Sequence, residues 1–73
     1  MDYHGQILTL EEWRSLIESG AVRWVTPRQI CRNWLLLAYG KDKIPLLAGI
    51  DDSEEAYAIV RAAGISVREP KGH

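Results

Sequence analysis

The chain has 73 residues, a length that accommodates one domain and no more. Nine Lys and Arg residues nearly balance ten Asp and Glu residues, and this balance gives no reason to expect general affinity for nucleic acid. The single cysteine, Cys31, excludes an internal disulfide, and no apolar run approaches the roughly 20 residues of a membrane span.

The N-terminal part of the chain predicts a short strand, a helix and a second strand. Gln6–Leu8 is a brief apolar run of strand type. Thr9 and Glu12 have the spacing of a capping box, so we expect a helix that begins there and ends at Gly20. The following segment, Ala21–Val25, is rich in strand-forming residues, which predicts a second short strand.

The central segment Thr26–Gly40 predicts the principal helix. Thr26 has the position of a helix cap, Pro27 suits the first helical residue, and Gln29 completes a capping box. On a helical wheel one face is apolar, formed by Ile30, Cys31, Trp34, Leu37 and Ala38. The other face is polar at first and then becomes apolar, which indicates that both sides of this helix are covered.

The C-terminal part predicts a strand, a helix and a strand, over Ile44–Ile50, Asp52–Ala63 and Ile65–Glu69. The helix is long enough to connect the two strands as a parallel crossover. We therefore predict a small α+β domain spanning 1–73, with three helices, a short two- to three-stranded sheet, and flexible tails at 1–5 and 70–73. An all-α three-helix domain is the alternative.

No pattern of catalytic, metal-ligating or cofactor-binding residues stands out. Cys31 lies on the predicted apolar face, where a thiol is inert packing material. His4 and His73 have no compact ligand spacing with Cys31. The carboxylates of Asp51, Asp52, Glu54 and Glu55 suit the start of a helix. We therefore expect neither an enzyme nor a bound metal, cofactor or small-molecule substrate.

The leading functional hypothesis is a small cytoplasmic interaction protein, an adaptor or inhibitor of the kind that phages and mobile elements encode. The start of the chain lacks the pattern of a signal peptide, which favours the cytoplasm. A marginal core and surplus aromatic and leucine surface favour a protein partner or a homodimer. The candidate partner-binding residues are Arg28, Arg32, Leu35, Leu36 and Tyr39.

The alternative is a small nucleic-acid-binding regulator that uses the basic segment Arg23–Lys43. Its candidate residues are of the types that grip phosphate and read base edges: Arg23, Arg28, Gln29, Arg32, Asn33, Lys41 and Lys43. A further option is that the acidic segment Asp51–Glu55 mimics nucleic acid toward a basic partner. A merely solvated helix face would show the same polar residues.

Overall fold

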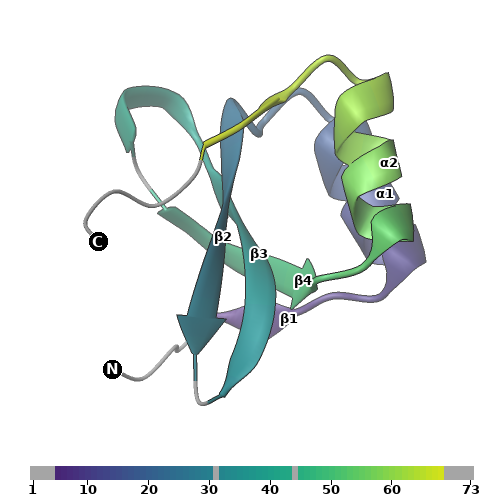
Figure 1. Cartoon of the computed structure of the whole chain (residues 1–73). Coiled ribbons are helices and arrows are strands. Elements are labelled where there is room, and N and C mark those ends of the chain that lie inside the picture. The colour runs from purple at the N-terminus through teal and green to yellow at the C-terminus, as the bar shows by residue number, and fades with distance from the viewer. Residues whose placement is uncertain (1–4, 31, 44, 69–73) are drawn as a thin grey trace.

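The computed structural model describes residues 5–30, 32–43 and 45–68 (Figure 1). Cys31, His4, His73 and, apart from Gly5, the predicted tails lie outside the described residues. The elements in chain order are β1 (Gln6–Ile7), α1 (Leu10–Glu18), β2 (Trp24–Ile30), β3 (Asn33–Tyr39), the 3₁₀ turn η1 (Lys41–Lys43), β4 (Pro45–Asp51), α2 (Glu54–Ala62) and β5 (Ser66–Val67).

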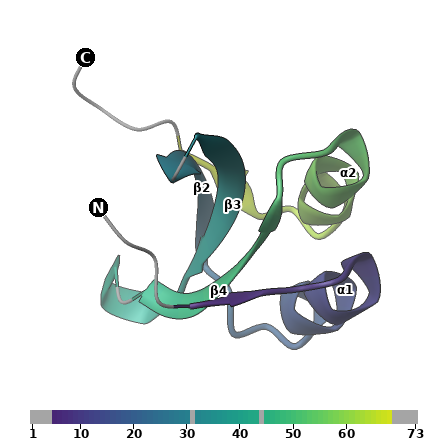
Figure 2. The ribbon, with the colours of Figure 1, turned by 90° about the horizontal axis from the view of Figure 1, so that it is seen from below.

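The fold is α+β, but the predicted arrangement of three helices with two or three strands is wrong, as is the all-α alternative. The described residues form two α-helices and a five-stranded mixed sheet with strand order β1-β4-β3-β2-β5. β3 is antiparallel to both of its neighbours, whereas the outer strands β1 and β5 are parallel to β4 and β2. Both helices are crossover connections between parallel strands, and they lie side by side on one face of the strongly twisted sheet (Figures 1 and 2).

Both helices begin at the caps that local sequence provides. The capping box of α1 is confirmed: the amide of Glu12 donates to Thr9 Oγ1 over 3.1 Å, and the amide of Thr9 donates to Glu12 Oε1 over 2.9 Å. The cap of α2 is Ser53, whose Oγ accepts from the amide of Ala56, so this helix begins later than the predicted Asp52. Glycines in the left-handed conformation follow both helices, with φ of 85° at Gly20 and 74° at Gly64.

The predicted helix over Thr26–Gly40 is wrong, because this segment is most of a β-hairpin. β2 pairs with β3 in register from Trp24–Tyr39 to Ile30–Asn33, which leaves a two-residue turn. Arg32 in that turn has φ of 71°, the left-handed conformation that tight hairpin turns favour. In the hairpin every residue of the apolar run Leu35–Ala38 is buried, as the apolar character of the predicted helix also required.

Pro27 fits inside β2 because of the direction in which its backbone points. The carbonyl of Val25 accepts from the amide of Arg68, on the side of β2 away from β3. Backbone groups alternate along a strand, so position 27 points to that same outer side. Proline has no amide proton, but at position 27 that proton would point away from β3, so the pairing of β2 with β3 is intact. In the described chain β5 pairs only with Trp24 and Val25, so it needs no donor at position 27 either.

The core lies between the helices and the sheet. Its buried apolar residues are Trp13, Ile17, Val22, Val25, Leu36, Ala38, Ile50, Ala56 and Val60. The indole N–H of Trp13 donates to the carbonyl oxygen of Ala56 over 3.2 Å, which ties α1 to α2 inside this core. The core residues of the hairpin are at alternate positions, so the residues between them face the other side of the sheet.

The other strand predictions are partly confirmed. Gln6–Leu8, Ile44–Ile50 and Ile65–Glu69 overlap β1, β4 and β5, respectively. β4 and β5 are parallel as predicted, although β3 and β2 lie between them. β4 contains an irregularity between the pairs Leu37–Gly49 and Tyr39–Pro45, and Leu47 within it has φ of 56°.

Candidate functional site

The face of the sheet opposite the helices, here called the open face, is the candidate site. Its residues are Ile7, Trp24, Thr26, Arg28, Ile30, Asn33, Leu35, Leu37, Tyr39, Gly49, Asp51 and Ser66, as assigned by their register with one another. Neither helix packs on this side (Figure 1). The strands place these side chains in rows across the sheet, each row with a different chemistry.

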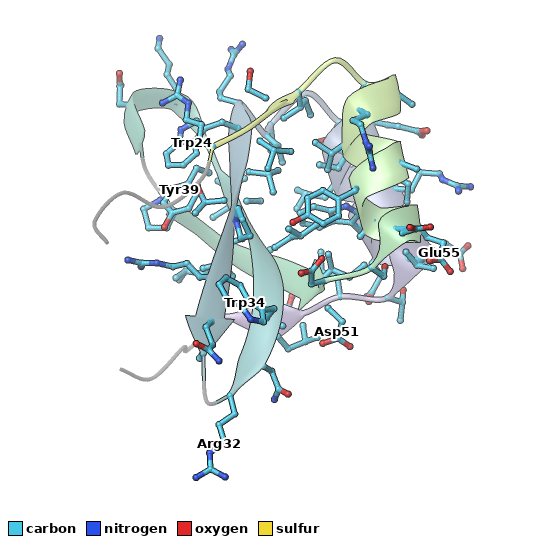
Figure 3. The ribbon with its side chains drawn as sticks, in the orientation of Figure 1. Trp24, Arg32, Trp34, Tyr39, Asp51 and Glu55 are labelled. Carbon is cyan, nitrogen blue, oxygen red and sulfur yellow. The ribbon has the colours of Figure 1, made fainter. Side chains whose placement is uncertain are left out.

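The first row is aromatic. Trp24 and Tyr39 are directly opposite each other in register, and their rings stack with centroids 4.2 Å apart and planes 9° from parallel (Figure 3). The guanidinium of Arg68, just after β5, lies 4.8 Å from the centroid of the Trp24 ring. Because Trp24 is in the strand between β5 and β3, Arg68 and Tyr39 approach it from opposite sides. Both faces of the indole are therefore occupied.

The second row is apolar except for Thr26. Ile7, Gly49, Leu37 and Thr26 are paired across four strands. Leu37 is only 7% exposed although it is outside the main core, whereas Ile7 at the sheet edge is 50% exposed. This row gives the open face an apolar centre that continues to exposed surface at β1.

The third row is charged at both ends. Leu35 is paired with Arg28 on one side and Asp51 on the other, and Leu35 itself is buried. Next to this row, Ile30 and Asn33 close the hairpin, and Arg32 extends from the turn (Figure 3). Arginine, tryptophan and tyrosine, which the open face combines, are enriched in protein interfaces.

The structure therefore separates the five candidate partner-binding residues. Arg28 and Arg32 are exposed, and Tyr39 is half-buried in the aromatic row. Leu35 is on the open face but only 6% exposed, so it offers a partner little contact area. Leu36 faces the helices with no exposed area, so a partner cannot contact it in the folded protein.

The candidate nucleic-acid residues are divided among three places. Arg28 and Asn33 are on the open face, and Arg32 is in the hairpin turn, but Gln29 is on the helix-covered face, where it pairs with Trp34. At the opposite end of the hairpin, Arg23 and Lys41 line one depression together with Arg68, and Lys43 ends the adjacent η1. The polar residues do not form the single stripe predicted for a helix. Successive side chains of a strand point to opposite faces of the sheet, so residues that would share one helix face are divided between two faces.

The acidic side chains lie mainly on the other side of the molecule. α1 carries Glu11, Glu12 and Glu18 against Arg14, and α2 carries Glu54 and Glu55 against Arg61. Glu54 and Glu55 occupy the first turn of α2, as expected of carboxylates at a helix start, whereas Asp51 belongs to β4. Figure 3 shows Glu55 on the helical layer, away from Trp24 and Tyr39.

Several site residues were missed by sequence reasoning. Ile7, Trp24, Leu37 and Arg68 contribute to the open face or its edge, yet none was a candidate. The signal that identifies them is the cross-strand register, which the sequence shows only once the hairpin turn is recognised. That turn contains Arg32 rather than the Asn-Gly or Asp-Gly that marks hairpins most clearly.

Within the described ranges, no group of three or more His, Cys, Asp or Glu residues is placed to hold a metal ion. In the same ranges, no helix is long and apolar enough to cross a membrane. Comparisons with protein-family models, curated proteins and solved structures found no match to this chain.

Proposed function

We propose that this protein is a non-enzymatic interaction protein, an adaptor or inhibitor, that binds an acidic surface of a protein partner through its open face. The observation that carries the proposal is the separation of charge between the two layers. Five glutamates lie on the helical layer against Arg14 and Arg61, whereas the described cationic side chains of the hairpin and its flanking segments outnumber Asp42 and Asp51: Arg23, Arg28, Arg32, Lys41 and Arg68. A basic surface steers and orients an acidic partner even when the net charge of the whole molecule is near zero.

The chemistry of the open face favours a protein over single-stranded nucleic acid. Proteins that bind single strands stack bases on exposed aromatic faces. Here the rings of Trp24 and Tyr39 cover each other, and Arg68 covers the second face of Trp24. Their edges, together with the exposed Ile7 and the two arginines, suit a protein surface better. A cytoplasmic location is part of the proposal, supported by a chain with one cysteine and hence no internal disulfide.

Two matched charge-reversal variants test the proposal. Arg28→Glu with Arg32→Glu changes the sheet side, and Arg14→Glu with Arg61→Glu makes the same change of net charge on the helices. All four side chains are exposed, so we expect both variants to stay folded, which circular dichroism checks. The sheet-side variant should lose at least about tenfold in affinity for the partner captured by the unmodified protein, and the helix-side variant should not.

A photo-crosslinking residue locates the contact directly. Placed at Asn33 on the open face, it should crosslink to an acidic segment of the captured partner, identified by mass spectrometry. Placed at Ala58, which is exposed on α2, it should not. Equal losses in both charge-reversal variants, or crosslinks from Ala58 alone, would overturn the proposal.

Two further measurements test whether nucleic acid or a second copy of this chain binds the open face instead. Retention of the pure protein on single-stranded or duplex oligonucleotides at low salt, lost in the sheet-side variant, would replace the proposal with nucleic-acid binding. Light scattering reports the solution mass, and a homodimer that the sheet-side variant dissociates would identify the partner as a second copy of this chain.

A further inference from the structure

A depression at the end of the hairpin away from its turn brings together cationic side chains from three separate segments. Its volume is about 350 Å³, and its lining residues are Arg23, Trp24, Gly40, Lys41, Asp42 and Arg68. Arg23 precedes β2, Lys41 begins η1 after β3, and Arg68 follows β5. The fold therefore assembles a charged site that no single stretch of the sequence contains.

Backbone hydrogen bonds and ring contacts hold the walls of this depression in place. The amide of Arg23 donates to the carbonyl of Tyr39 over 2.8 Å, and the amide of Arg68 donates to the carbonyl of Val25 over 2.8 Å. The Arg68 guanidinium packs on Trp24, which is itself stacked on Tyr39. The backbone amides of Arg23 and Arg68 are therefore both hydrogen-bonded, and the side chain of Arg68 is also held against the ring of Trp24.

The positive charge of the side chains that line the depression favours an anionic ligand. Among the described residues, three cationic side chains and one carboxylate, that of Asp42, line the depression, and this lining has an excess of positive charge. A phosphate monoester carries a charge of about −1.5 to −2 at pH 7 and has three acceptor oxygens, whereas a carboxylate carries a single charge. Arginine presents a planar pair of donors to phosphate oxygens, and lysine adds a mobile point charge. A nucleobase has no free indole face to stack on, because both faces of Trp24 are occupied.

We propose that this depression binds a phosphate monoester group, on a free molecule or on a phosphorylated side chain. Arg23 and Arg68 hold its oxygens from two sides of the depression, and Lys41 supplies the third positive charge. Arg23, Lys41 and Arg68 also belong to the basic side of the molecule, but the variants that test the protein partner change Arg28 and Arg32, so the two proposals can fail separately. It adds an anion-specific contact at the far end of the hairpin.

The test is a titration of the pure protein with inorganic phosphate at constant ionic strength, followed by two-dimensional amide NMR. The indole N–H of Trp24 and the backbone amide of Lys41 should shift saturably. Sodium chloride and sodium acetate at the same ionic strength should leave them in place. Affinity should rise between about pH 5.5 and about pH 8, because inorganic phosphate changes from a monoanion to a dianion over this range. Sulfate, which is a dianion at both pH values, should show no such rise.

The double variant Arg23→Gln with Lys41→Gln should bind phosphate at least tenfold more weakly. The matched variant Arg14→Gln with Arg61→Gln, on the helical layer, should bind it as the unmodified protein does. Neither variant alters the Arg68–Trp24 contact, and the dispersion of the amide spectrum shows that each is folded. Absence of saturable shifts, equal shifts with acetate, or unchanged affinity in the Arg23–Lys41 variant would overturn the proposal.

Peptides distinguish the two sources of the phosphate. A short peptide with one phosphoserine is compared with its unphosphorylated form and with inorganic phosphate. Tighter binding of the phosphopeptide than of inorganic phosphate supports a phosphorylated side chain as the ligand. Binding of inorganic phosphate as tight as that of the phosphopeptide supports a free phosphorylated molecule. Equal binding of both peptides would overturn phosphate recognition.

Discussion

Leu36→Ala tests whether the layer between sheet and helices holds this small fold together. Leu36 has no exposed surface and is paired with Pro27 on one side and Ile50 on the other. The substitution removes buried apolar atoms from the middle of the sheet and leaves a cavity under the helices. Such changes lower the free energy of unfolding by about 2–5 kcal/mol.

The total stability of the domain makes that loss severe. At roughly 0.05–0.15 kcal/mol per residue, a 73-residue chain has a free energy of unfolding of about 4–11 kcal/mol. With a urea slope of about 1 kcal/mol per M, the midpoint of unfolding should fall by about 2–5 M. A loss in the upper part of the range leaves a substantial unfolded population without urea. Urea titrations followed by far-UV circular dichroism and tryptophan fluorescence measure both quantities.

Leu47→Ala is the matched control. It removes the same atoms from a leucine that is 59% exposed, and alanine keeps the left-handed backbone of that position as leucine does. Its free energy of unfolding should stay within about 0.5 kcal/mol of that of the unmodified protein. Equal losses in the two variants, or a loss below that limit for Leu36→Ala, would refute the assignment of Leu36 to the core.

Two further substitutions test the helical layer. Trp13→Phe removes the buried indole donor to the carbonyl of Ala56 and should lower the free energy of unfolding by about 1–3 kcal/mol, seen as a drop in Tm of at least about 4 °C. A drop no larger than that of Trp34→Phe, whose ring is half exposed, would contradict this. Gly64→Ala should cost about 1 kcal/mol through backbone strain alone, because φ is 74° and no atom lies within 4 Å of the added methyl group. D-alanine at position 64, introduced by chemical synthesis, should restore the Tm; failure to do so would show that another effect is responsible.

The two helices were predictable because their signals are local. A cap such as Thr9 with Glu12 forms its hydrogen bonds within one turn, and glycine after the last turn relieves strain wherever the helix packs. Trp13 and Ile17, one turn apart, likewise place one side of α1 in the core. The start of α2 was misplaced only slightly, because Asp52 and Ser53 are both good caps.

The hairpin was not predictable from the same signals. Thr26 and Gln29 have capping-box spacing, but two residues with this spacing can equally well lie in a strand. The run Leu35–Ala38 is buried on both faces of the sheet, so it lacks the alternation of a half-exposed strand. A short continuous apolar run is compatible with either a buried strand or a buried helix. The last turn of the predicted helix had no polar side, and this was the one feature of the sequence that argued against a surface helix.

The sequence by itself determined where this chain forms α1 and α2, since capping and termination depend on residues within a few positions of each other. It also determined that the middle of the central segment is buried, because the run Leu35–Ala38 is entirely apolar. Only the tertiary structure decided that this segment is a hairpin, because cross-strand pairing links residues whose separation the sequence leaves open. The same pairing decided the candidate sites. Arg23, Lys41 and Arg68 meet beside Trp24 because three strand ends converge there, and this convergence is a property of the sheet order rather than of any local pattern.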